Sequence, residues 1–347
     1  MKKILTTLVV AVLGVAAAQA QSSVIALLSH EGNVTTFNGA TALQKAHEAA
    51  VNGDVITLSS GTFHSVDITK GVTVRGAGML PDTLMGTEPT VISGNFTFNM
   101  EEAGDSAAVA FEGIQFNSDE IVCNYANNVT FNKCIIHTIE YYGSESSTMN
   151  NLTFVHCRVW GNLSLPNNGN AICKNSYINY PFCYNESSSN FDFTNCVINH
   201  TRPSDLKTSI LRNCIFLDRF TNNNYDYKLP STITVSYSIA MAFQGSTRNP
   251  FSNISTSTSW TVTSDSIATI FKTYTGNYDN YETFELTPEA AAQYIGSDGT
   301  QVGMYGGSTP YTATPSISGL QVTKFQVAPK SDASGKLSID IEVKTAE

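Results

Sequence analysis

The sequence predicts an all-β fold, a parallel β-helix whose short strands coil into rungs of about 20 residues. A repeated sequence pattern, typified by Phe191 to Asn199, recurs through the middle of the chain. In each copy two short alternating apolar runs meet at a polar bend. The low charged content, 14% of residues, suits walls of strands joined by polar turns. One position after the bend is mostly small and recurs at intervals of 18 to 24 residues: Ile114, Cys134, Cys157, Ser176, Cys196, Cys214 and Ser238.

Residues 1–20 have the character of a secretory signal. Lys2 and Lys3 precede an apolar stretch, and small residues at Ala18 and Ala20 mark a cleavage site. The apolar stretch is too short for a stable transmembrane helix. We therefore expect an exported chain that begins near Gln21, is extracellular, at the cell surface or in the periplasm, and does not insert into a membrane.

A single helix is expected at the start of the solenoid, from about Ala42 to Val51. Thr41 is suited to be its N-cap, and Asn52 with Gly53 is suited to end it. This helix would cover the open end of the solenoid, where an unpaired strand edge invites aggregation. The first strands then follow at residues 55–58, 63–68 and 72–74.

Each rung has room for a third short strand beyond the two in the repeated sequence pattern. Candidates for this strand are Ile121 to Tyr125, Ile139 to Tyr142, Leu163 to Leu165 and Phe182 to Tyr184. The bends between the first two strands often hold Asn, which tolerates the left-handed backbone that such a corner needs. Stacked Asn side chains can also hydrogen-bond to one another along the column.

Four of the cysteines occupy the small position of the repeat: Cys134, Cys157, Cys196 and Cys214. Seven cysteines in an exported chain would usually suggest disulfides. A shared inward-facing position instead favours buried, reduced thiols that act as small apolar side chains. One or more disulfides is the alternative, and no Cys or His spacing is typical of a zinc site.

The character of the chain changes after Ala240. A polar Ser/Thr-rich stretch precedes a short helix that Thr287 can cap, and from Pro315 onward two alternating runs predict a β-hairpin. We therefore divide the chain into a signal peptide (1–20), a β-helix domain (21–310) and a hairpin (311–347). The hairpin is expected either to cap the C-terminal end of the solenoid or to be a small β module.

The order of the helix, NGDVITLSSGTF, VDITKGVTVRGAG and repeats of the NVTFNKCII type resembles the right-handed parallel β-helix superfamily, which includes pectate lyases. Residues 297–307, SDGTQVGMYGG, look similar to the closing segment of exported members of Bacteroidota type. The resemblance covers about residues 40–240 and implies a right-handed fold. It leaves activity open, because the superfamily includes lyases, hydrolases, esterases and proteins that are not enzymes.

Glu120 and Glu140 are the candidate catalytic residues. As the resemblance implies, lyases of this fold use carboxylates that bind calcium and an Arg or Lys base. The two glutamates are twenty residues apart, so they could be neighbours on adjacent rungs. Two solvated surface glutamates are the alternative, since neither an Arg-x-x-Pro-x-x-Arg motif nor paired Asp strings occur. We expect no cofactor and no metal, with calcium only in the case of a lyase.

Aromatic residues near the third strand are the candidate ligand contacts, because sugar rings stack on flat aromatic faces and the Tyr hydroxyl or Trp N–H can hydrogen-bond to them. They are Tyr141, Tyr142, Trp160, Tyr180 and Tyr184. The alternative is that several of them point into the core.

The sequence therefore predicts a surface or secreted protein that binds a polysaccharide or host glycan without cleaving it, or that mediates adhesion. The alternative is a polysaccharide lyase or glycoside hydrolase acting on an acidic polysaccharide. A net charge of -10 without a basic stripe argues against nucleic acid as a partner.

Overall fold

The computed structural model describes most of the chain, and the predicted signal peptide, Tyr142 and Tyr184 lie outside the described residues. The described ranges are 24–82, 86–104, 106–141, 149–166, 168–183, 189–200, 206, 208–218, 229–242, 250–254, 256–263, 267–275, 282–312, 320–327, 336 and 339–345.

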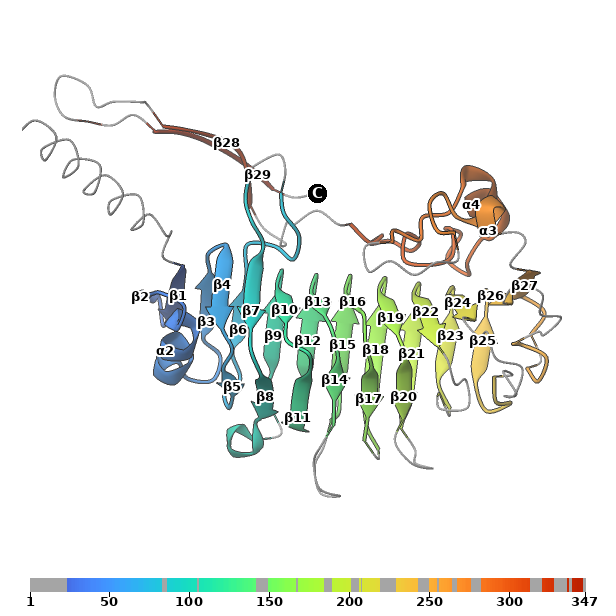
Figure 1. Ribbon diagram of the computed structural model, residues 1–347, viewed down its shortest axis with the longest axis horizontal. Helices are drawn as coiled ribbons and strands as arrows, with labels where there is room; N and C mark the ends of the chain where they lie inside the picture. The colour runs from blue at the N-terminus through green and yellow to red at the C-terminus, as the bar shows by residue number, and fades with distance from the viewer. Residues whose placement is uncertain are drawn as a thin grey trace, which may run out of the picture.

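The predicted parallel β-helix is confirmed: three sheets form its walls (Figure 1). Sheet A contains, in spatial order, β2 (Asn33–Asn38), β1 (Ile25–His30), β3 (Val55–Leu58), β6 (Thr73–Arg75), β9 (Val109–Glu112), β12 (Val129–Asn132), β15 (Leu152–Val155), β18 (Asn170–Lys174), β21 (Asn190–Thr194), β23 (Ile210–Arg212) and β25 (Thr234–Ser236). Apart from the antiparallel pairs that β1 makes with β2 and β3, its strands are parallel.

The other two sheets complete each rung. Sheet B contains β4 (Gly61–His64), β7 (Thr90–Ser93), β10 (Gln115–Asn117), β13 (Ile135–Ile136), β16 (Arg158–Val159), β19 (Tyr177–Asn179), β22 (Val197–His200), β24 (Ile215–Asp218), β26 (Ile239–Ala242) and β27 (Trp260–Thr263). Sheet C contains β5 (Asp67–Ile68), β8 (Phe96–Asn99), β11 (Ile121–Tyr125), β14 (Ile139–Glu140), β17 (Leu163–Leu165) and β20 (Pro181–Cys183). A 3-10 turn, η1 (Glu101–Ala103), follows β8.

The polar bend of the repeated sequence pattern is the corner between sheets A and B. Its residues have φ between +47° and +56°, namely Lys133, His156, Asn175, Asn195, Asn213 and Tyr237. Cys or Ser follows each of them and points inward, as the spacing predicts. Cys157 Sγ donates to the carbonyl of Phe131 on the preceding rung (3.2 Å), and Ser176 Oγ accepts from the Cys157 N–H (3.0 Å). A thiol and a hydroxyl therefore fit the same slot, and the seven cysteines are buried and form no disulfide.

The interior is filled by aromatic and aliphatic side chains that repeat from rung to rung. The ring of Phe131 stacks between those of Phe111 and Phe154, with centroids 5.6 Å and 5.3 Å away. All three rings are at most 1% exposed. In-register pairing of β9, β12 and β15 produces this column, because equivalent residues then lie one strand spacing apart.

The helix α2 (Ala42–Ala49) begins at the predicted residue and packs beside β1, β2 and β3 at the N-terminal end. Thr41 does not cap it through its side chain, so that detail of the prediction is wrong. Lys70 satisfies the other end instead: its Nζ donates to the carbonyls of His47, Glu48 and Ala50 at 2.7 to 2.9 Å. A cation at a helix C-terminus also complements the helix dipole.

His47 makes this N-terminal cap sensitive to acid. The residue is 3% exposed, and burial together with the nearby Lys70 ammonium lowers its pKa to about 4 from an ordinary 6.5. Because the folded pKa lies below the unfolded one, stabilisation is complete above pH 6.5 and fades as pH falls toward 4. We expect a loss of at most about 3 kcal/mol in the free energy of unfolding over this window. Urea titrations between pH 7 and 4 should show that the free energy of unfolding falls less in His47→Gln than in the parent chain. An equal fall in both would contradict the role of His47 in this pH dependence.

The region after β27 does not leave the solenoid but covers it. Helices α3 (Ile267–Ile270) and α4 (Pro288–Gln293) lie over the C-terminal half of sheet B (Figure 1). Outward residues of sheet B, such as Val197 and Ile215, are fully buried under this segment in a second apolar cluster with Phe284 and Met304. The N-cap role predicted for Thr287 is confirmed, since its Oγ1 accepts from Ala290 N.

Residues 297–307, the closing segment, dock on the corner column of Asn side chains. Asn175 Nδ2 donates to the carbonyls of Met304 (3.0 Å) and Gly306 (2.7 Å). Asn213 Oδ1 accepts from the backbone N–H and the hydroxyl of Ser297. The amides of these two residues therefore bind the closing segment, whereas the sequence suggested bonds along the column.

Beyond this segment, β28 (Leu320–Val327) and β29 (Ile339–Thr345) form an antiparallel hairpin. Among the described strands they pair only with each other. Tyr311, at the predicted boundary, still belongs to the body of the protein, because its hydroxyl accepts from Arg158 Nε at 2.9 Å. No helix in the described ranges has the length and apolar character needed to cross a bilayer.

Candidate functional site

The outer side of sheet C and the turns that lead into it from sheet B hold three of the predicted site residues, Glu120, Glu140 and Tyr180. We call this surface the outer strip and define it by Glu120, His137, Glu140, Tyr180 and Phe182. The parallel register places Glu140 beside Val122 on the preceding rung. On the next rung Ile139 aligns with Leu163, so Glu140 adjoins Ser164. Ser164 in turn aligns with Phe182 on the rung after that.

Glu140 is buried, with 8% exposure, and its carboxylate is held by neutral donors. Oε1 accepts from Asn162 Nδ2 at 2.8 Å, and Oε2 lies 3.1 Å from the hydroxyl of Ser164. The ion pairs among the described residues all involve other carboxylates. Such bonding fixes the side chain in one position on the rigid strand and leaves it poorly placed to transfer a proton to a ligand.

Glu120 lies on the adjacent rung, as its spacing predicted, but not directly beside Glu140. Ile121 aligns with Ile139, so Glu120 sits two residues before the position opposite Glu140. From the strand spacing and the rise per residue, the two Cα atoms are about 8 Å apart. Glu120 is half-buried, whereas Glu140 is buried, so the two carboxylates have different environments.

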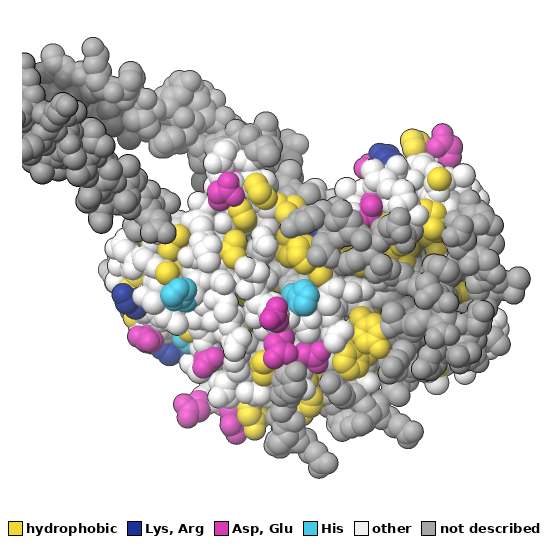
Figure 2. All heavy atoms as spheres, viewed as in Figure 1, with side chains coloured by type: hydrophobic (Ala, Val, Ile, Leu, Met, Phe, Trp, Pro, Cys, Tyr) yellow, Lys and Arg dark blue, Asp and Glu magenta, His cyan; other side chains and the backbone are white. Residues whose placement is uncertain are grey.

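His137 is the most accessible titratable ring of the outer strip. Its Nδ1 lies 2.6 Å from the carbonyl oxygen of Asp119. A carbonyl can only accept, so Nδ1 carries the hydrogen and the neutral ring keeps Nε2 as an acceptor. Figure 2 shows a histidine side by side with acidic side chains near the middle of the face in view. The sequence pattern did not single out His137.

The predicted aromatic residues divide between core and surface. Tyr141 packs against the interior core, and Trp160 packs against the apolar cluster beneath the C-terminal segment. Tyr180 is half-buried and meets Phe182 edge to face, with ring centroids 5.6 Å apart. Sequence reasoning did not single out Phe182, although alternation could have found it, because its neighbours Pro181 and Cys183 are the inward residues of β20.

The turns beneath the outer strip are tightly built. Asn179 Nδ2 donates to the carbonyl of Trp160, and its Oδ1 accepts from Asn199 Nδ2 at 2.7 Å. Gly161 has no room for a side chain, since an added Cβ would lie 2.8 Å from the carbonyl oxygen of His137. These contacts hold successive turns in one arrangement, which pre-organises the surface above them.

The outer strip thus offers hydrogen-bonding groups and an aromatic pair on a rigid support. In the described part of the chain, no three His, Cys, Asp or Glu side chains gather closely enough to hold a metal ion. Comparisons with protein-family models, curated proteins and solved structures gave no match. The geometry of the outer strip is therefore the basis for assigning a function.

Proposed function

We propose that this chain is an exported, non-catalytic β-helix protein that binds a polysaccharide or host glycan, or mediates adhesion, through the outer strip. The observation that supports this most directly is the pair of Tyr180 and Phe182 on the same side of sheet C as Glu140. Aromatic faces bind the apolar side of sugar rings, and nearby amides and carboxylates bind their hydroxyl groups.

The repetitive support suits an elongated ligand. Strands of sheet C lie about 4.8 Å apart, so a chain of sugars along the solenoid axis would meet a new rung at regular intervals. Each contact is weak, and several together produce useful affinity because the linked units bind at a high effective concentration. The rigidity of the turns lowers the entropy that binding must overcome.

The alternative is a polysaccharide lyase or glycoside hydrolase acting on an acidic polysaccharide with Glu120 and Glu140. The placement of these residues on adjacent rungs favours it. The hydrogen bonds that Asn162 and Ser164 donate to Glu140 disfavour it, because a general acid or base must be free to meet its substrate. A lyase would also require a calcium site, for which carboxylate and carbonyl oxygens must converge.

Removal of the aromatic pair should weaken glycan binding. On the full chain, we expect Tyr180→Ala and Phe182→Ala each to reduce affinity for the best ligand of an immobilised glycan panel about 5-fold to 10-fold, the effect of losing one stacking contact of ~1 kcal/mol. Ile172→Ala is the matched control, since Ile172 is an exposed apolar residue on sheet A.

The same panel separates binding from catalysis. Incubation of each acidic polysaccharide with and without calcium, followed by assays for unsaturated ends and reducing ends, should yield no product. Cleavage that disappears in Glu140→Gln would replace our proposal with the enzymatic alternative. If no glycan on the panel binds the parent chain, the proposal is wrong.

A further inference from the structure

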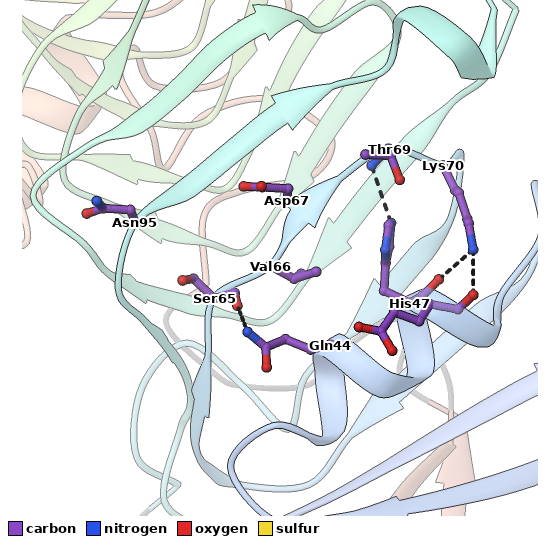
Figure 3. Close-up of a pocket in the computed structure, with 9 residues that line it drawn as sticks. Gln44, His47, Ser65, Val66, Asp67, Thr69, Lys70 and Asn95 are labelled. Atoms are coloured by element: carbon purple, nitrogen blue, oxygen red, sulfur yellow. Dashed lines mark hydrogen bonds between the residues drawn. The ribbon is translucent and has the colours of Figure 1, made fainter.

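A second surface, outside the outer strip, is hollowed between helix α2 and strand β5. Figure 3 shows this groove, which has a volume of about 670 Å³ and opens to solvent. Its size is within the range of small-molecule sites in proteins. The residues that matter for its chemistry are Gln44, His47, Glu48, Asp67, Lys70 and Asn95.

Some of these groups are occupied by the fold. The Lys70 ammonium donates to three carbonyls at the end of α2, which uses all of its hydrogens. Gln44 Nε2 donates to the carbonyl of Ser65 at 2.9 Å, and His47 Nε2 accepts from the Thr69 N–H at 3.4 Å. The walls of the groove are therefore tied together before any ligand arrives.

Other groups remain available to a ligand. Among the described residues, the carboxylates of Glu48 and Asp67 and the amide of Asn95 make no hydrogen bond or ion pair, and all three side chains are exposed. His47 is 97% buried, yet it lines the groove, and its Nδ1 has no hydrogen-bond partner in the described part of the chain. Because Nε2 is an acceptor, the neutral ring keeps its hydrogen on Nδ1.

The charge balance of the groove defines what it can bind. His47 is neutral near pH 7, since burial lowers its pKa to about 4. Lys70 brings one positive charge to the groove, but its hydrogens are directed at backbone carbonyls, so the two exposed carboxylates of Glu48 and Asp67 leave the lining with a net negative charge. A polar ligand that carries a positive charge and several hydroxyl groups would satisfy these groups, whereas an anionic sugar would meet like charge.

We propose that this groove binds an amino sugar, with its ammonium group on Glu48 and Asp67 and its hydroxyl groups on Asn95, Gln44 and His47. The groove begins on the first strand of sheet C, and the outer strip begins two strands farther along the same sheet. The site is thus separate from the outer strip and does not rest on the function proposed for it.

Titration of the full chain with glucosamine oligomers tests this assignment. We expect saturable binding, visible by calorimetry and as a shift of the His47 ring signals in NMR spectra. Glu48→Gln and Asp67→Asn remove charge while keeping shape, and each should weaken binding about 10-fold, the value of one charge-assisted hydrogen bond. Glu289→Gln, an exposed carboxylate on α4, is the matched control and should leave binding unchanged.

Two comparisons complete the test. Galacturonate oligomers should bind at least about 10-fold more weakly than glucosamine oligomers, since the carboxylates repel them. Tyr180→Ala should leave glucosamine binding unchanged, which distinguishes this groove from the outer strip. Absence of glucosamine binding, equal binding of the uronate, or indifference to both Glu48→Gln and Asp67→Asn would overturn the proposal.

Discussion

Phe131→Ala is expected to lower the free energy of unfolding by about 3–5 kcal/mol. The ring of Phe131 is 1% exposed and stacks on both neighbouring rungs, with Phe111 on one side and Phe154 on the other. Its loss removes a large apolar surface from the core and leaves a cavity that two rigid rungs cannot fill. Denaturant titration of Phe131→Ala and of the parent chain at neutral pH measures this difference in the free energy of unfolding.

Thr130→Ala is the matched control for this prediction. Thr130 is the preceding residue of β12, faces outward and is half-buried, so its truncation should cost less than about 0.5 kcal/mol. Phe131→Leu should fall between the two, since it keeps most of the apolar volume. A cost below about 1 kcal/mol for Phe131→Ala would show that the column is not a continuous core.

The repeat made the solenoid predictable. The alternation of apolar residues on each side of a corner fixes which side chains face inward, because the side-chain period of a strand is two. The small residue after the corner, such as Cys196, follows from the close approach of consecutive rungs. Asn at the bend pointed to a left-handed corner, and Lys133, His156 and Tyr237 show that the position holds other residues in the same conformation.

The segment that covers sheet B was harder to predict, although a signal was present. Val197 and Ile198 are consecutive and both buried, as are Ile215 and Phe216. Two neighbouring apolar residues in a strand indicate that both faces are covered. The sequence does not say what covers the outer face, since contacts between Asn175 and Met304 join residues far apart in the chain.

The candidate site was predicted only in part, for two physical reasons. Rungs differ in length, so a twenty-residue spacing does not guarantee alignment, and Glu120 falls two residues short of Glu140. Aromatic residues serve both core and surface, which is why Tyr141 packs inward while Tyr180 meets Phe182 at the surface. The groove beneath α2 escaped sequence reasoning because its walls come from a helix, a strand and two turns.

Asn213→Leu is expected to release the closing segment and to cost about 3–5 kcal/mol. Asn213 is 1% exposed, and its amide binds both Ser297 and Asp298. Leucine would lose the hydrogen bond from the part-buried N–H of Ser297, worth about 0.5–1.5 kcal/mol, and a bond to the carboxylate of Asp298, worth about 1.5–3 kcal/mol. It would also adopt φ near +56°, which adds about 1–2 kcal/mol for a residue other than Gly or Asn.

Release of the closing segment has a consequence beyond stability, because it uncovers Val197 and Ile215 on sheet B. Hydrogen exchange of residues 297–307 should therefore accelerate in Asn213→Leu, while strands β12 and β15 keep their protection. Asn213→Gly separates the two causes, since glycine accepts the corner conformation and lacks the amide. Residues 297–307 could be as well protected from hydrogen exchange in Asn213→Gly as in the parent chain. In that case the amide contacts do not hold the segment, and backbone conformation alone explains why Asn occupies this corner.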